Sequence, residues 1–170
     1  MSLIKTLIAA LTLATASLGA HADAIYRFTG TTDSGSRTGE AYDGEFSIAD
    51  VANDFDGSLA LLSFSMNAFG QTYLLSDADA PALAYFAAGT FLGVDFSASG
   101  TGDPALRPIV TLMPGWFDPS EAYLAYDATG NGTEGFGSLA FERLQAVPEP
   151  TTAALLLLGL VGAGTLRRRR

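Results

Sequence analysis

The sequence predicts an all-β fold, an antiparallel β-sandwich of the jelly-roll or immunoglobulin-like kind, followed by a C-terminal transmembrane helix. Short stretches in which apolar and polar residues alternate have the period of half-buried strands. Turn residues separate these stretches at spacings of roughly ten residues, which is typical of sandwiches and barrels. An uncharged run rich in leucine, alanine and glycine, at residues 151–166, predicts the transmembrane helix.

Strands and glycine-containing turns follow one another along the middle of the chain. Turns such as Asn131-Gly132 favour hairpins, because glycine supplies the positive φ that tight turns require. Residues 77–88 are rich in alanine and break the alternation, so a short helix beginning near Asp77 or Asp79 is expected there. The predicted strands cover residues 25–29, 45–48, 62–66, 72–75, 90–97, 108–112, 122–126 and 137–144.

The N-terminus has the features of a secretory signal peptide. Lys5 precedes an apolar run, and two small-x-small cleavage sites follow it, one from Ala20 to Ala22 and one from Ala22 to Ala24. We therefore expect the general secretion machinery to export the chain and signal peptidase to remove residues 1–22, or 1–24 if the second site is used. A first transmembrane helix is the alternative.

The C-terminus carries three features in a fixed order: a proline-rich segment, the uncharged run and a cluster of arginines. The run forms a minimal span, because a helix of that length rises about 24 Å against about 30 Å of hydrocarbon. Arginines stay on the cytoplasmic side, so the chain before residue 147 should lie outside the cytoplasm. The segment before the run is Val147, Pro148, Glu149 and Pro150, and the membrane-stop residues are Arg167, Arg168, Arg169 and Arg170.

This arrangement resembles the PEP-CTERM sorting signal of Gram-negative bacteria, over residues 147–170. The resemblance implies that an exosortase, an integral-membrane processing enzyme, recognises the tail. It also implies a transient membrane anchor, then delivery to the cell surface or extracellular matrix, in association with exopolysaccharide and biofilm. An ordinary single-pass anchor that stays in the membrane is the alternative.

Between the two signals, residues 23–146 form one predicted exported domain of strongly acidic character. This segment has four arginines and no lysine against seventeen of the eighteen carboxylates, which gives a formal charge of −13. Such a charge repels nucleic acids and anionic lipids, so no nucleic-acid partner is expected.

The same segment lacks the residues on which most catalytic sites depend. The sequence has no cysteine, and its single histidine, His21, leaves with the signal peptide. Ser-His-Asp and Cys-His catalysis, histidine-ligated metals and Schiff-base lysines are thereby excluded from the mature domain. We expect a protein that is not an enzyme and has no cofactor. A pair of carboxylates able to hydrolyse a glycoside is the alternative that the composition leaves open.

Two aromatic residues are candidates for a carbohydrate platform. Trp116 lies on a proline-rich loop, and Tyr123 follows closely. Aromatic residues at such positions stack against sugars in carbohydrate-binding modules, although in sandwiches they more often fill the core.

Oxygen-bearing side chains gather at two places and suggest a calcium site. Asp54 and Asp56 precede a glycine, and Asp127 and Asn131 flank a glycine-rich turn. Hard cations prefer oxygen ligands. Neither cluster has the spacing of an EF-hand, and Asx turns explain both without an ion.

The sequence as a whole predicts an exported surface or matrix protein with a structural or polysaccharide-associated role. The alternatives are a carbohydrate-binding module and a glycoside hydrolase, each acting in the extracellular matrix.

Overall fold

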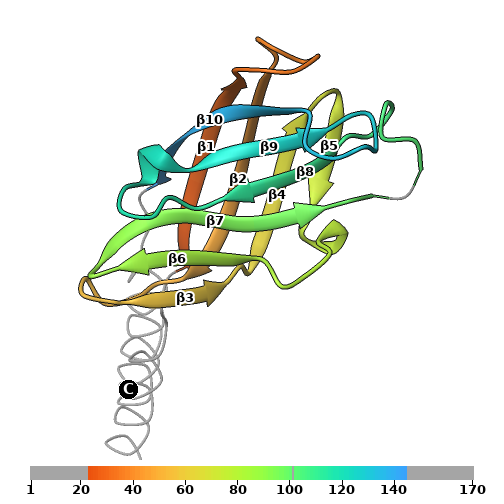
Figure 1. Cartoon of the computed structure of the whole chain (residues 1–170). Helices are drawn as coiled ribbons and strands as arrows, with labels where there is room; N and C mark the ends of the chain where they lie inside the picture. The colour runs from red at the N-terminus through yellow and green to blue at the C-terminus, as the bar shows by residue number, and fades with distance from the viewer. Residues whose placement is uncertain (1–22, 101, 145–170) are drawn as a thin grey trace, which may run out of the picture. The chain divides into compact units, whose positions relative to one another are not determined.

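A computed structural model describes residues 23–100 and 102–144, which form an antiparallel β-domain (Figure 1). The predicted all-β, antiparallel class is confirmed. The transmembrane helix predicted for residues 151–166 lies outside the described residues, and no helix within them is long and apolar enough to cross a bilayer. The elements are β1 (Asp23–Thr32), β2 (Ala41–Ala49), β3 (Gly57–Ala60), β4 (Ser63–Ala68), β5 (Gln71–Leu74), η2 (Leu75–Asp77), β6 (Leu83–Ala87), β7 (Thr90–Ala98), β8 (Ile109–Met113), η3 (Pro119–Glu121), β9 (Tyr123–Asp127) and β10 (Gly135–Leu144).

One sheet contains all ten strands, in the order β3-β6-β7-β8-β9-β10-β1-β2-β4-β5. Strand β3 lies at one edge and β4 lies second from the other edge, yet only Leu61 and Leu62 separate them in the chain. A connection this short requires the sheet to curl until its two ends approach each other. The backbone N–H of Leu62 donates to the carbonyl of Ser47 on β2 at 2.8 Å, which secures this corner.

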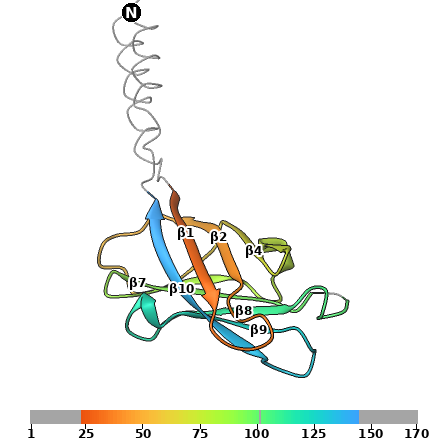
Figure 2. The same cartoon turned by 90° about the horizontal axis from the view of Figure 1, so that it is seen from above.

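The expected sandwich of two separate sheets is therefore corrected to one curled sheet, and β10 is the reason. Its first residues pair with β9, and most of its length pairs with β1, from Thr32 opposite Gly137 to Ile25 opposite Leu144. A ten-residue strand is long enough to serve both neighbours, so it joins two groups of strands that a sandwich would keep apart. Figure 2 shows β1 and β10 lying side by side.

Aromatic side chains fill the concave side of the sheet. Phe64 on β4 stacks on Phe96 of β7 with ring centroids 4.0 Å apart. Tyr26 on β1 stacks on Phe91 of β7 at 4.7 Å. These contacts cross the core between strands that are distant in the sheet order, and such aromatic pairs stabilise a fold beyond the area that they bury.

A glycine on β1 makes room for one of the core tyrosines. A side chain at Gly30 would collide with the ring of Tyr42 and with the carbonyl of Ser138. Tyr42 is buried, and its hydroxyl donates to that same carbonyl across the β1–β10 pair. Burial raises the pKa of Tyr42 well above its ordinary value, so the phenol stays protonated as a donor.

Residues 77–88 do not form the expected helix. The structure instead has the short turn η2 and then β6, where Ala84 and Phe86 face the core. Pro81 interrupts any helix in the middle of this segment, and β6 pairs with both β3 and β7. Pairing on two sides therefore overrides the helix propensity of alanine. Strands β3 and β6 are the two that the alternation did not predict.

Candidate functional site

A short loop after β8 displays two aromatic side chains to solvent. Trp116 and Phe117 are each 85% exposed, the most exposed large apolar residues among those that the structure describes. The carboxylate of Glu121 accepts hydrogen bonds from the backbone N–H groups of both residues, each at 3.0 Å. The loop is therefore held in one conformation while its two aromatic rings remain free.

The residues next to this aromatic pair fix the course of the loop. The N–H of Gly115 donates to the carbonyl of Leu92 on β7 at 3.0 Å, and a side chain at Gly115 would collide with the carbonyl of Asp118. Asp118 accepts from the N–H of Ser120 at 2.8 Å, and this bonding lowers the pKa of Asp118. Carboxylates that accept N–H bonds cap short helical turns in this way.

The aromatic loop continues into the convex surface of β8, β9 and β10, opposite the core. Met113 and Tyr123 are directly opposite each other on β8 and β9 and are 38% and 36% exposed. The ring of Phe136 on β10 packs edge-on against Tyr123 at 5.7 Å. We call this surface the outer face; it comprises the side chains of Thr111, Met113, Tyr123, Ala125, Phe136 and Ser138.

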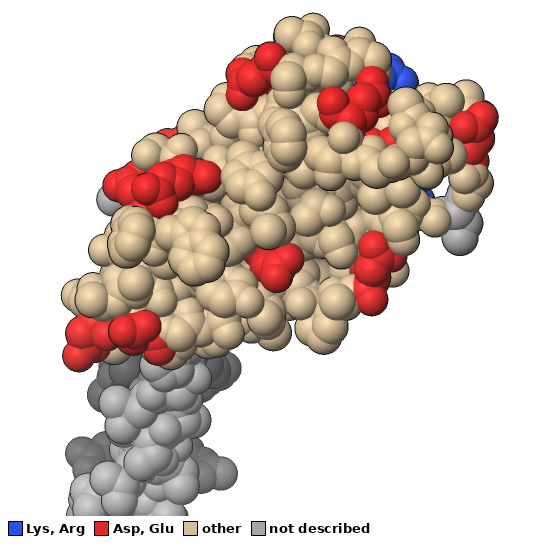
Figure 3. Space-filling view, viewed as in Figure 1, with Lys and Arg blue, Asp and Glu red and all other residues tan. Residues whose placement is uncertain are grey.

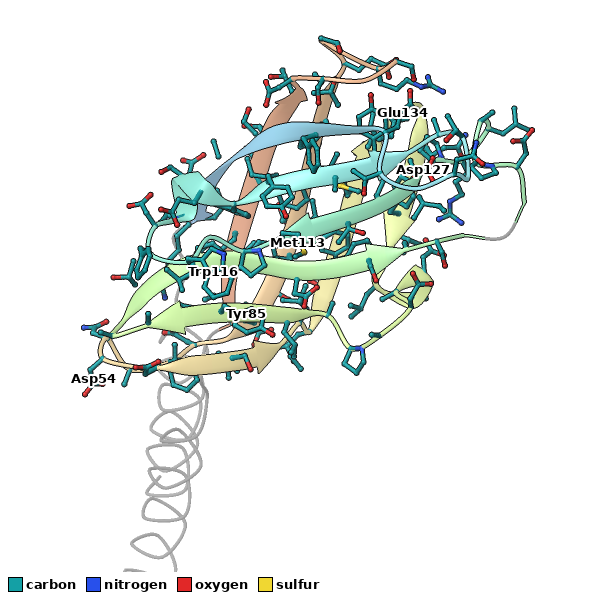
Figure 4. All side chains as sticks on the ribbon, in the orientation of Figure 1. Asp54, Tyr85, Met113, Trp116, Asp127 and Glu134 are labelled. Atoms are coloured by element: carbon teal, nitrogen blue, oxygen red, sulfur yellow. The ribbon has the colours of Figure 1, made fainter. Side chains whose placement is uncertain are left out.

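The structure thus places both predicted platform residues on the surface. Figure 4 shows Trp116 and Met113 on the same side of the domain. Sequence reasoning did not find Met113, Phe136 or Glu121. Their signals were present: Met113 and Phe136 fall on the outward positions of their strands, and Glu121 follows Trp116 and Phe117 by five and four residues.

The calcium candidates lie in two separate places. Figure 4 shows Asp54 and Asp127 at opposite ends of the domain. Across residues 23–100 and 102–144, no three acidic, histidine or cysteine side chains come together in a group able to hold a metal ion.

Asp127 closes the β9–β10 turn. One of its carboxylate oxygens accepts from the N–H groups of Thr129 and Gly130, and the other accepts from the N–H of Gly132 at 2.9 Å. Although partial burial disfavours the charged form, these bonds prevail and lower the pKa of Asp127 to about 2. Asn131 joins the same turn through its N–H, which donates to the hydroxyl of Thr129 at 3.2 Å. Backbone donors therefore occupy both oxygens of the carboxylate.

A second carboxylate of this region, Glu134, ties two loops together. It accepts from the N–H of Ser36 in the β1–β2 loop and from that of Ala128 in the β9–β10 loop. Bonding from Ser36 lowers the pKa of Glu134. The hydroxyl of Tyr126 adds to this junction by donating to the carbonyl of Ser34 at 2.9 Å.

The residues predicted for export and sorting lie almost wholly beyond the described part. Ala20, Ala22, the Val147–Pro150 segment and the four terminal arginines are outside it. Ala24 is the exception: it lies in β1, is 2% exposed and belongs to the core.

The fold and its surface define a small acidic β-domain with an exposed aromatic face, in a chain that ends in a separate tail. Comparison with known families identifies the tail. A protein-family model described as the PEP-CTERM protein-sorting motif matches residues 146–170. The chain therefore carries this motif, as its resemblance had implied. No curated protein and no solved structure matches the chain.

Proposed function

We propose that this chain is an exported protein that an exosortase recognises and processes, and that the released domain serves the cell surface or extracellular matrix. The PEP-CTERM motif at residues 146–170 carries this proposal. The domain that precedes the motif is the part that is delivered, and it has a structural or polysaccharide-associated role and no enzymatic activity. Signal peptidase and the general secretion machinery deliver it to the outer side of the inner membrane.

The end of the fold supports processing at the tail. Strand β10 is paired with β1 as far as Leu144. In the sequence only Gln145 and Ala146 separate Leu144 from Val147. The motif thus begins where the paired domain ends, so a membrane enzyme can act on it without unfolding the sheet.

The direction of the pKa shifts among the carboxyl groups supports a role without catalysis. A glycosidase acid needs a carboxyl group whose pKa is raised. The described carboxyl groups with a clear shift are all lowered: Asp77, Asp118, Asp127 and Glu134. Each of these accepts hydrogen bonds from the backbone of its own loop or from a neighbouring loop, which favours the charged form.

Mass spectrometry of the native protein tests the sorting proposal. The released protein should lack Arg170 and the rest of the apolar tail, and a strain without the exosortase should retain them. Replacement of Pro148, Glu149 and Pro150 by alanine should block release, whereas the same change at Thr151 and Thr152 should not. An intact C-terminus in the released protein would contradict processing. An intact C-terminus found only in membranes, in both strains, would indicate a permanent anchor.

A carbohydrate-binding module is the second candidate, and the exposure of Trp116 and Tyr123 favours it. Single exposed apolar side chains are ordinary, but several exposed aromatic residues on one loop and the strands that flank it are characteristic of a binding site. This candidate is compatible with sorting, because it concerns the domain and not the tail.

A further inference from the structure

We propose that the outer face and the adjoining loop that carries Trp116 bind a neutral polysaccharide, with Tyr123 and Trp116 stacking against its sugar rings. The inference deepens the carbohydrate-binding candidate above and names its ligand class. It does not depend on how the tail is processed.

The first support is the absence of charge on the outer face. Its six side chains are apolar, aromatic or hydroxyl-bearing, in a domain that carries seventeen carboxylates. Carboxylates border the face at two places: Asp95 lies on the neighbouring strand β7, and Asp127, at the end of β9, lines a depression together with Thr111 and Ala125. Figure 3 shows this side of the molecule as mostly uncharged, with separated acidic groups. The uncharged area continues towards β1 into a shallow depression of about 380 Å³, lined by Thr29, Gly30, Thr31, Ser138, Leu139 and Ala140.

The second support is the pairing of aromatic rings with hydroxyl groups. A sugar ring has an apolar C–H face and polar edges, so it requires an aromatic surface beneath it and hydrogen-bonding groups beside it. Met113 lies opposite Tyr123, Tyr123 opposite Ser138, and Ser138 opposite Thr31. This row crosses four strands, or about 14 Å at the usual strand spacing. An oligosaccharide segment fits a row of that length better than a single sugar does.

The third support is that the surface is ordered before any ligand arrives. Glu121 holds the backbone of Trp116 and Phe117, and the ring of Phe136 packs against Tyr123. Tyr123, Met113 and Phe136 stand on paired strands and not on free loops. A preformed surface loses little conformational entropy on binding, which favours affinity.

Charge decides between the candidate occupants. A second copy of the domain would bring another −13 charge, and anionic lipids, nucleic acids and acidic polysaccharides would be repelled as well. A basic protein would require acidic groups within the face, and none of its six side chains is acidic. Of the carboxylates at its border, Asp127 is already bonded by backbone N–H groups. A neutral glycan meets no electrostatic penalty and makes use of both the rings and the hydroxyls.

Affinity electrophoresis of the protein released from cells tests the proposal. Native gels would contain hydroxyethylcellulose, dextran or galactomannan, with carboxymethylcellulose as the anionic counterpart of the first polymer. We expect at least one neutral polymer to retard the protein and the anionic counterpart to retard it less. Trp116 is the only tryptophan of the sequence, so its fluorescence should shift to shorter wavelength with the same polymer.

Matched variants assign the effect to the outer face. Tyr123→Ala and Trp116→Ala should each weaken retardation about tenfold, the effect of about 1.4 kcal/mol. Tyr123→Phe, which keeps the ring, should retain it. Leu106→Ala is the control, because Leu106 is 72% exposed on the β7–β8 loop, away from the face. Circular dichroism confirms that each variant is folded, and the C-terminal mass of each variant reports sorting separately.

Three results would overturn the proposal. The first is the absence of retardation by all three neutral polymers. The second is equal retardation of the native protein and both alanine variants. The third is a dimer in sedimentation experiments that Tyr123→Ala dissociates, since the face would then belong to a second copy.

Discussion

Gly30 and Tyr42 show how a small residue on one strand determines the position of a large residue on the next. The ring of Tyr42 occupies the space beside Gly30, and its hydroxyl reaches the carbonyl of Ser138. The sequence reveals that a glycine interrupts the strand pattern, but the ring that fills the space is visible only in the fold.

Gly30→Ala should therefore destabilise the domain by about 1–3 kcal/mol or more, because an added methyl group cannot fit without moving a strand. Urea denaturation followed by circular dichroism measures this change. Thr29→Ala is the matched control, since Thr29 is exposed on the same strand. Equal stability of the two variants would show that the space beside Gly30 yields easily.

Asp127 makes stability depend on pH in the acid range. Its folded pKa of about 2 lies below the value of about 3.9 for an unfolded aspartate. Its contribution should be fully present above about pH 4 and should be lost as the pH falls towards about 2. Asp127→Asn should flatten this part of the curve of unfolding free energy against pH, which chemical denaturation measures.

Asp43→Asn serves as the control for Asp127→Asn. Asp43 lies at an exposed position of β2, so its replacement removes the same charge without removing the hydrogen bonds of a turn. If both variants give the same curve, the hydrogen bonds of the β9–β10 turn are not the source of the pH dependence.

At the scale of elements, alternation of apolar and polar residues predicted eight of the ten strands. Its success is clearest in β1 and β4, where the buried residues alternate with more exposed ones. It missed β3, which has no buried residue, and β6, whose alanines suggested a helix. In both cases, pairing with neighbours that are distant in the sequence determines the structure, and local sequence carries no record of those neighbours.

Strand β1 favours one of the two predicted signal-peptide cleavage sites. Asp23 pairs with Ala49, Ala24 pairs with Ile48, and Ala24 is buried in the core. Cleavage after Ala24 would remove both residues from a central strand. We expect the mature protein to begin at Asp23, and N-terminal mass spectrometry of the exported protein would identify the terminus. A mature chain that begins at Ile25 would contradict this expectation.

At the scale of the whole molecule, the few cations are placed against carboxylates. Arg37 pairs with Glu40, Arg107 with Asp77 and Arg143 with Asp50. The side chains of these pairs are all at least partly exposed to solvent, and such pairs contribute little individually. Their common effect is to reduce repulsion within a domain that has many more acidic than basic groups.

Arg27 gives a test of that repulsion, because its register partners are Glu142 on β10 and Glu45 on β2. Arg27→Gln should lower the melting temperature in dilute buffer by leaving two like charges across one strand. The difference from the native protein should shrink at about 0.15 M salt, where charges are screened beyond about 8 Å. A difference that does not change with salt would indicate lost packing and not lost charge.

The sequence was most informative about the tail and least informative about the domain's surface. Three features in a fixed order were enough to predict the sorting motif, because linear motifs need no folding to be recognised. The outer face could not be predicted in the same way. Tyr123 and Tyr126 are three residues apart in β9, so alternation places them on opposite faces of the sheet. Which strands surround the exposed Tyr123 and complete the outer face is visible only from the pairing of β9 with β8 and β10.

The position of β10 also sets an order of events during export. In export led by the predicted signal peptide, the N-terminus would cross the membrane first. Strand β10 would then emerge last, although it is the strand that connects β9 to β1. Until β10 emerges, one edge of its partner β1 stays unpaired, because Ile25 pairs with Leu144, about 120 residues later in the chain. An export intermediate stalled before β10 should accordingly be digested by protease, and one stalled after Leu144 should resist. The sorting motif follows β10 in the chain, so the motif would become accessible only after every strand of the domain has emerged.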